Sequence, residues 1–227
     1  MSYFLTQEGT NMKQICRMIL TLCLPLLLCS PVMAEHEGPY VGAFVGGNAL
    51  MEAKNTDSLG QFSFTFKPNL SGSAVFGWDF APGNPVGQGR IELEYTRRSN
   101  QLDKVKFAEG SFPGEGDVTA DSLMINFFGV YPDKKKWAPY FGVGGGVARI
   151  EASNLKVTGE TLAAGTDTVL AYQLGAGVDY SLMKYLTIDL GYRFFNTVRP
   201  EFSEANGQKF KMDYMSHSVV FGLRAGF

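Results

Sequence analysis

Cysteine, basic charge and long apolar runs are all scarce in this chain. Its three cysteines, Cys16, Cys23 and Cys29, fall within the first thirty residues, so no later position can supply a thiol nucleophile, a disulfide or a thiolate metal site. The 20 Lys and Arg are outnumbered by 22 Asp and Glu, which argues against a protein that binds nucleic-acid phosphates. Beyond the N-terminal segment no apolar run reaches the ~18 residues of a transmembrane helix.

Glycine, aromatic residues and apolar residues are abundant. Hydrophobic residues make up 45% of the chain, with 18 Phe and 10 Tyr, which is too much apolar surface for a disordered protein. Charged residues reach only 19%, below the roughly 25% of soluble domains, while 27 glycines exceed the usual share. This composition indicates a glycine-rich and aromatic-rich β protein.

The N-terminal segment has the layout of a secretory signal peptide. Lys13 and Arg17 precede the apolar core Met18–Cys29, and Val32-Met33-Ala34 places small residues at −3 and −1. The apolar core is too short for a spanning helix, which needs ~20 residues. We therefore predict a signal peptide over 1–34 and a mature domain over 35–227.

Two alternatives concern the same segment. Met12 is a more natural start than Met1, since Lys13 follows it directly. Cys29 is a second candidate for processing, as the lipidated cysteine of a lipoprotein. Leu28 stands before it, however, where a small residue is expected. The predicted cleavage therefore leaves Glu35 as the first residue.

Alternation of apolar and polar residues with a period of two recurs along the mature chain. In Arg90–Arg98, for example, Ile91, Leu93 and Tyr95 alternate with charged residues. Eight segments of about ten to fourteen residues are predicted as strands on this pattern, longer than the ~5–6 residues of average strands: Tyr40–Met51, Leu70–Phe80, Arg90–Arg98, Leu123–Tyr131, Trp137–Ile150, Val169–Tyr180, Tyr185–Thr197 and Ser216–Phe227.

The connections between these segments alternate in length. Long ones are predicted as loops over Glu52–Asn69, Ser99–Ser122, Glu151–Thr168 and Val198–Asp213. Short ones are predicted as turns over Ala81–Gly87, Pro132–Lys136 and Ser181–Lys184. Long loops on one rim and short turns on the other are typical of an outer-membrane barrel with both termini periplasmic. We predict an all-β fold, an eight-stranded antiparallel up-and-down transmembrane β-barrel.

The two faces of the predicted strands differ in bulk, which indicates the face that meets lipid. Eight strands enclose an interior only just wide enough for side chains. Glycines and charges fit inside, whereas the large apolar residues face hydrocarbon. The charged residues of the inner face are predicted to form a paired lumen network, because isolated buried charges are costly: Asp79, Arg90, Glu92, Glu94, Arg98, Asp179, Asp189, Arg193 and Arg224.

Several motifs resemble those of a known family. Pro139-Tyr140-Phe141-Gly142-Val143-Gly144-Gly145-Gly146, Tyr172-Gln173-Leu174-Gly175-Ala176-Gly177-Val178-Asp179-Tyr180, Leu190-Gly191-Tyr192-Arg193, Tyr40-Val41-Gly42-Ala43 and the terminal Phe227 resemble the eight-stranded outer-membrane β-barrel family, typified by the OmpA transmembrane domain and opacity-type surface proteins. The resemblance implies a Gram-negative outer-membrane location and contact with lipid and lipopolysaccharide. It also implies that Phe227 is an assembly signal for the barrel-insertion machinery.

The sequence favours a structural or surface-interaction role carried by long extracellular loops. A narrow or gated pore for ions or small solutes, of the porin-like kind, is the alternative. A lipid-modifying enzyme is a more distant one, since His217 and Ser218 are adjacent in a strand and must face opposite ways. No catalytic, cofactor or metal site is therefore predicted, and the chain is not expected to be an enzyme.

The first long connection holds the candidate residues for a loop contact. Phe62, Phe64 and Phe66 alternate, with the parity of the lipid-facing Leu70. They are interpreted either as an extension of the following strand above the membrane or as an apolar contact for a ligand or receptor. The long connections together carry net negative charge, which leaves divalent cations or basic partners as further possibilities.

Overall fold

The computed structural model describes residues 37–56, 61–80, 88–131, 136–204 and 209–227. The predicted signal peptide over 1–34, both start sites and the predicted turn over 81–87 lie outside these residues, as does most of the predicted turn Pro132–Lys136. Among the described residues there is no helix that is long and apolar enough to cross a bilayer.

The described elements are all strands, and the strands pair with one another in antiparallel fashion throughout. The prediction of an all-β antiparallel fold is therefore confirmed. The described residues form twelve strands where the sequence predicts eight: β1 (Gly38–Leu50), β2 (Ala53–Thr56), β3 (Gln61–Phe66), β4 (Asn69–Phe80), β5 (Gly89–Phe107), β6 (Gly110–Val130), β7 (Trp137–Val157), β8 (Glu160–Met183), β9 (Leu186–Thr197), β10 (Glu201–Glu204), β11 (Lys209–Met212) and β12 (Met215–Gly226).

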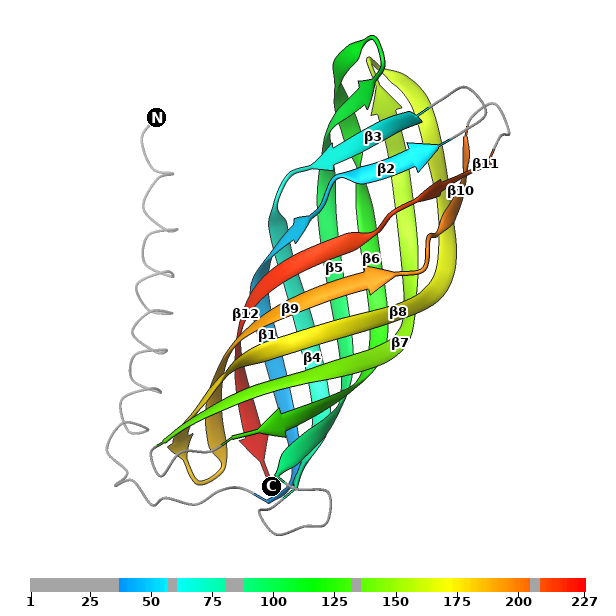
Figure 1. Ribbon diagram of the computed structural model, residues 1–227. Helices are drawn as coiled ribbons and strands as arrows, with labels where there is room; N and C mark the ends of the chain where they lie inside the picture. Colours follow the sequence, from blue (N-terminus) through cyan, green and yellow to red (C-terminus); the bar gives the residue numbers. More distant parts are fainter. Residues whose placement is uncertain (1–36, 57–60, 81–87, 132–135, 205–208) are drawn as a thin grey trace, which may run out of the picture. The chain divides into compact units, whose positions relative to one another are not determined.

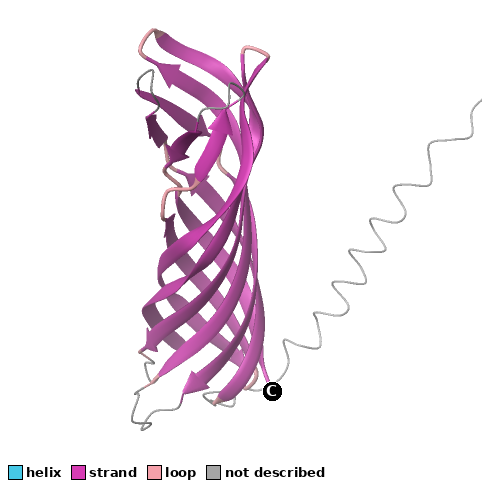
Figure 2. Cartoon of the chain, turned by 90° about the vertical axis from the view of Figure 1, so that its right-hand side faces the viewer, coloured by secondary structure: helices cyan, strands magenta, loops and turns pink. Residues whose placement is uncertain are grey.

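The eight long strands pair in a closed series. β1 pairs with β4, and the pairing continues through β5, β6, β7, β8 and β9 to β12. β12 then pairs with β1 over its full length, from Tyr40 opposite Gly226 to Leu50 opposite Ser216. Both neighbours of every long strand are thus occupied, and the long strands wind together around a common axis (Figures 1 and 2).

The predicted loops over Ser99–Ser122 and Glu151–Thr168 are wrong. β5 runs on to Phe107 and β6 begins at Gly110, so the segment is a continuous hairpin. β7 and β8 are joined in the same way by Thr158 and Gly159, which have positive φ angles of 51° and 89°. A turn of this kind matches the twist of the flanking strands. Along these strands the outward face changes from apolar to polar, and the inward face changes from charged to apolar.

The other two predicted loops contain the four short strands. β2 and β3 form a hairpin beside β5, and β10 and β11 form another beside β8. The two hairpins meet where Lys211 lies opposite Thr56 and Met212 opposite Asn55. Figure 1 shows these strands at the end of the sheet away from the C-terminus. We call this end the hairpin half (51–56, 61–68, 99–121, 149–168, 198–204 and 209–214) and the remainder the terminal half.

The polarity of the two faces reverses between the halves. In the terminal half the outward side chains are exposed and apolar, including Val45, Phe76, Leu93, Phe127, Val143, Leu190 and Phe221. In the hairpin half most exposed side chains are polar, including Gln101, Lys104, Lys106, Glu115, Asp117, Arg149 and Glu151. Its interior is an apolar cluster that includes Phe62, Phe64, Leu102, Val105, Val118, Ile150, Leu155, Phe202, Phe210 and Met212. The hairpin half therefore packs like a water-soluble β domain.

Candidate functional site

The interior of the terminal half holds a buried ion-pair cluster centred on Arg90. The guanidinium, whose side chain has no exposed surface, lies 3.0 Å from a Glu92 oxygen and 3.3 Å from an Asp189 oxygen. It also pairs with Asp179. Arg224 pairs with the same Asp179 and lies 3.5 Å from Asp79 and 3.7 Å from Asp189. Asp179 is thus shared between two guanidinium groups.

Glu94, Arg98 and Arg193 lie in the same interior without an ion pair to a described residue. Glu94 accepts hydrogen bonds from Thr96, Asn126 and Gln173 at 2.7, 2.8 and 3.2 Å. Arg98 donates to Ser122 at 2.8 Å and to Gln173 at 3.2 Å. Arg193 donates to the Tyr140 hydroxyl at 3.1 Å. The nine predicted residues thus divide into six that form ion pairs and three that are held by neutral groups.

Two tyrosines that were not predicted from the sequence pattern complete this network. The Tyr40 hydroxyl donates to Glu92 at 2.6 Å, and the Tyr140 hydroxyl donates to Asp189 at 2.7 Å. Glycine makes room for both rings, since a Cβ at Gly77 would lie 2.3 Å from Tyr40 and one at Gly191 would lie 2.5 Å from the Tyr140 hydroxyl. Both tyrosines stand at inward-facing positions in the alternation of their strands. That alternation is the sequence signal that could have identified them.

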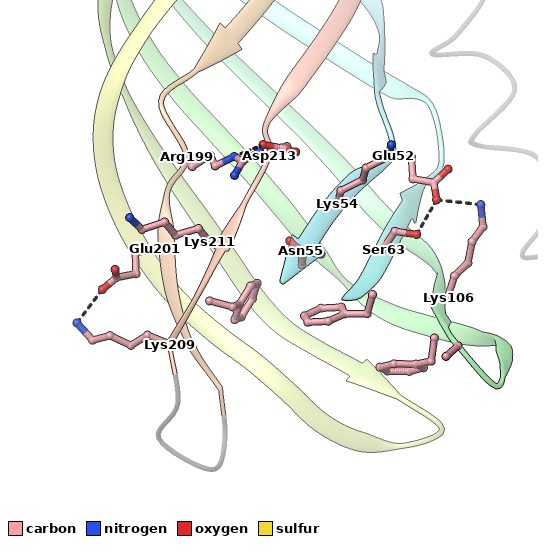
Figure 3. A pocket seen from close by; sticks show the side chains of 14 residues that line it. Glu52, Lys54, Asn55, Ser63, Lys106, Arg199, Glu201, Lys209, Lys211 and Asp213 are labelled. Atoms are coloured by element: carbon pink, nitrogen blue, oxygen red, sulfur yellow. Dashed lines mark hydrogen bonds and ion pairs between the residues drawn. The ribbon is translucent and has the colours of Figure 1, made fainter. Parts of the chain in front are cut away.

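A cleft opens between the β2–β3 and β10–β11 hairpins (Figure 3). Its volume is about 730 Å³, within the range of small-molecule sites. Five cations, three carboxylates and three phenylalanines are among the residues that line it: Lys54, Lys106, Arg199, Lys209, Lys211, Glu52, Glu201, Asp213, Phe62, Phe107 and Phe210. The net charge of this lining is positive, in contrast to the negative charge of the predicted loops as a whole.

Each carboxylate of the cleft already has a cation. Lys106 lies 3.1 Å from Glu52, Arg199 lies 2.6 Å from Asp213, and Lys209 lies 2.7 Å from Glu201. Hydrogen bonds from Ser63 and Lys106 lower the pKa of Glu52, and the bond to Glu201 raises the pKa of Lys209. Lys54 and Lys211 form no ion pair with any residue that the structure describes.

The side chains of Phe62, Phe64 and Phe66 do not share the outward face of Leu70, so the prediction from their even spacing is wrong. Phe64 is fully buried, Phe62 is 7% exposed, and Phe66 packs against the same apolar cluster, so the rings face inward rather than outward. Lys67 and Pro68 interrupt the strand, and Pro68 has no N–H to donate. The alternation of inward and outward positions around Leu70 therefore does not extend across this break to β3. The three rings belong to a core and do not form an exposed apolar contact surface.

Three further features concern the His217–Ser218 pair, metal ligands and Phe227. Ser218 is buried and donates to Asn48 at 2.8 Å, whereas His217 contacts the Tyr192 hydroxyl on the outer face, so the two residues do not meet. No group of three or more His, Cys, Asp or Glu that could hold a metal is found in the described part of the chain. Phe227 is 67% exposed, and its backbone N–H donates to the Pro39 carbonyl at 3.1 Å.

Comparison with known proteins gives consistent results. A family model described as an outer membrane protein beta-barrel domain matches residues 20–224. The OprG outer membrane protein of Pseudomonas aeruginosa has a similar structure, with 13% identity, a TM-score of 0.55, and coverage of 86% of this chain and 99% of that one. Neisserial surface protein A gives 19% identity, a TM-score of 0.50, and coverage of 84% and 97%. No curated protein sequence matches the chain significantly.

Proposed function

Since the chain belongs to the outer-membrane β-barrel domain family, we propose that its eight long strands form a transmembrane barrel that anchors a surface-interaction domain. The terminal half lies in the outer membrane in this proposal, with both termini in the periplasm. The hairpin half projects outward as a rigid β extension. The four short strands belong to that extension, which accounts for the difference between twelve strands and eight.

The reversal of polarity supports this placement. A band of exposed apolar side chains surrounds the terminal half, and closure of the ring satisfies its backbone N–H and C=O groups, as a bilayer requires. On β5 the exposed outward residues change from Leu93 and Tyr95 to Arg97 and Gln101, which marks the proposed membrane boundary. The paired interior charges then fill the barrel, and Lys136 lies on the periplasmic rim.

The observation that carries the surface-interaction role is the packed core of the hairpin half. Loops that merely connect strands have no need for a core, yet here Phe64, Leu102 and Val105 are fully buried. Ordering such a segment costs conformational entropy, which the apolar cluster offsets. The result is a preorganised surface with polar walls and a cleft, suited to binding a partner.

Single cysteines test the orientation, because the mature chain contains none. Glu109→Cys lies in the β5–β6 turn and Lys184→Cys in the β8–β9 turn. On intact cells a membrane-impermeant maleimide should label Glu109→Cys alone, and permeabilised cells should label both. Labelling of Lys184→Cys alone on intact cells would reverse the orientation. The interaction role requires that cells carrying the protein bind a surface or partner that cells lacking it do not.

A gated pore is the second candidate, and the shared Asp179 is the observation that favours it. A carboxylate between Arg90 and Arg224 can change partners, and a change of partner alters the packing of the interior. Planar-bilayer recordings separate the two candidates. Stable openings that change in frequency in an Arg224→Gln variant would support the pore, whereas silent bilayers with correctly folded protein would support the filled barrel.

A further inference from the structure

Asp179 and Asp189 are two carboxyl groups placed face to face in the interior of the terminal half. In the register of β8 and β9 the two residues lie directly opposite each other. Asp189 is fully buried, and Asp179 is 5% exposed. Like charges at directly opposite positions of a sheet repel each other, and burial strengthens the repulsion. The arrangement is therefore costly if both groups are ionised.

A hydrogen bond joins the two carboxyl groups. An ionised carboxylate only accepts hydrogen bonds, so a bond between two carboxyl groups requires a proton on one of them. The Oδ1 atom of Asp179 is buried, and no N–H or hydroxyl of another described residue donates to it. It has almost no accessible surface, so water does not reach it. A hydroxyl on Asp189 supplies the donor that this buried acceptor needs.

The guanidinium contacts indicate which carboxyl group holds the proton. Arg90 and Arg224 each lie 2.5 Å from the Oδ2 atom of Asp179. Their distances to the Oδ2 atom of Asp189 are longer, at 3.3 Å and 3.7 Å. The other Asp189 oxygen accepts from the Tyr140 hydroxyl at 2.7 Å. Close contact with two cations favours the ionised form of Asp179, and the looser contacts of Asp189 favour its protonated form.

The charges of the interior contain a matching imbalance. The lumen network predicted from the sequence has five carboxylates and four guanidinium groups, so ionisation of every group leaves one negative charge in excess. An uncompensated buried charge is costly, and a single proton removes it. The charged and titratable groups around the pair come from strands on all sides of the interior: Tyr40 of β1, Asp79 of β4, Arg90 and Glu92 of β5, Tyr140 of β7, Arg193 of β9 and Arg224 of β12.

We propose that Asp179 and Asp189 form a proton-binding site, in which Asp189 holds one proton at neutral pH and donates a hydrogen bond through it to ionised Asp179. The shared proton links β8 to β9 and balances the charges that fill the interior. This inference goes beyond the proposed anchoring role and does not depend on the orientation of the barrel in the membrane.

Infrared spectroscopy of the purified full chain at neutral pH tests for the proton directly. Vesicles of ether-linked phospholipid are used, because they contain no ester carbonyl that would mask the signal. Ordinary carboxyl groups are ionised at this pH, since their pKa values are about 3.9 for Asp and 4.3 for Glu. The C=O stretching band of a protonated carboxyl group should nevertheless be present, and it should shift when aspartate carries carbon-13 in its side-chain carboxyl. Absence of the band, or a shift with labelled glutamate alone, would overturn the proposal.

A variant and its control assign the band to the pair. D189N imitates the protonated group, because an amide donates to Asp179 and accepts from Tyr140, and it should remove the band. D121N takes a carboxyl group from the Arg97–Asp121 pair and should leave the band unchanged. A band that persists in D189N would place the proton on another residue and contradict the site. The labelled wild-type protein decides the question even if D189N does not fold.

Unfolding in urea gives a second readout. Unfolded aspartates have lost their protons above a pH of about 5, so a folded state that keeps one binds one proton more than the unfolded state. By linkage, this proton should make the equilibrium constant for unfolding rise about tenfold for each unit of pH between about 5.5 and 7. D189N should lack this contribution, and D121N should retain it. The same pH dependence in the wild type and D189N would rule out a proton held by Asp189.

Discussion

The guanidinium of Arg98 lies over the ring of Phe195, with its central carbon 4.1 Å from the ring centroid. Both side chains are buried, and they stand where two kinds of interior meet. On one side are the ion pairs and hydrogen bonds around Arg90 and Glu94, and on the other is the apolar cluster of the hairpin half, to which Phe195 belongs. A cation over an aromatic face suits this boundary, because the ring attracts the charge without itself being polar.

Removal of the central guanidinium should destabilise the barrel strongly. In Arg90→Ala the carboxylates of Glu92, Asp179 and Asp189 lose a shared cation within a buried cluster, and a loss of about 3–5 kcal/mol in the free energy of unfolding is expected. Urea unfolding of the protein in lipid vesicles measures it. Arg97→Ala is the control, because the exposed Arg97–Asp121 pair should contribute under about 1 kcal/mol. Similar losses in both variants would contradict a dry, paired interior.

Truncation of a core phenylalanine should loosen the hairpin half selectively. Phe64→Ala leaves a cavity beside Phe66 and Phe210 and should cost about 3–5 kcal/mol locally. Hydrogen exchange should show faster exchange in β2 and β3 and unchanged protection in β9 and β12 of the terminal half. Phe76→Ala, on the exposed apolar band, should leave the protection of β2 and β3 unchanged. A uniform loss throughout the chain would mean that the two halves unfold as one unit.

Two outward positions on β5 locate the membrane. Leu93→Arg places a cation on the proposed lipid-facing band and should cost about 2–4 kcal/mol, the range for a barrel near the bilayer midplane. Gln101→Arg adds the same charge to the same strand and face above the band, where water solvates it, and should be nearly neutral. Folded fractions in lipid vesicles over a urea series measure both. Equal effects would refute a membrane boundary between the two positions.

Acid should weaken the contact between β3 and β5 through Glu52. Its pKa is lowered by hydrogen bonds from Ser63 and Lys106, so the carboxylate is favoured in the folded state. The stabilisation is therefore complete above the unfolded pKa of about 4.3 and is lost as pH falls through the lower, folded pKa. The protection of the Ser63 amide, measured relative to its intrinsic exchange rate at each pH, should fall over that range in the wild type but not in Glu52→Gln. An identical pH profile in both proteins would assign the effect to another group.

Deletion of Phe227 should slow insertion more than it weakens the folded barrel. The ring is exposed at the end of the β12 ladder, so few packing contacts are lost, while the proposed recognition by the insertion machinery is removed. Heat-modifiable gel mobility of outer-membrane fractions measures folded yield over time. Deletion of residues 219–227 is the comparison. It removes most of β12, which pairs with both β9 and β1, and should abolish folding. Normal insertion kinetics without Phe227 would remove the signal role.

The sequence by itself determined the strands of the terminal half and the direction of their faces. The alternation in Arg90–Arg98 is a local property, since adjacent residues of a strand point to opposite sides whatever strand lies beside it. Inward charges and outward apolar residues then indicate an environment opposite to that of a soluble protein. The placement of Glu92, Arg193 and Arg224 on one face followed from this pattern, although their partners did not.

Only the tertiary structure decided the arrangement of the hairpin half. The segments 99–122 and 151–168 have mostly polar outward side chains, and periodicity does not distinguish such a strand from a polar loop. The side chains of Phe62 and Phe64 point inward because the strand breaks at Pro68 and because β3 pairs with β5, about forty residues further along the chain. The sharing of Asp179 and the cleft between two hairpins likewise depend on registers between distant strands. Those registers are set by long-range packing, which no single segment of the sequence contains.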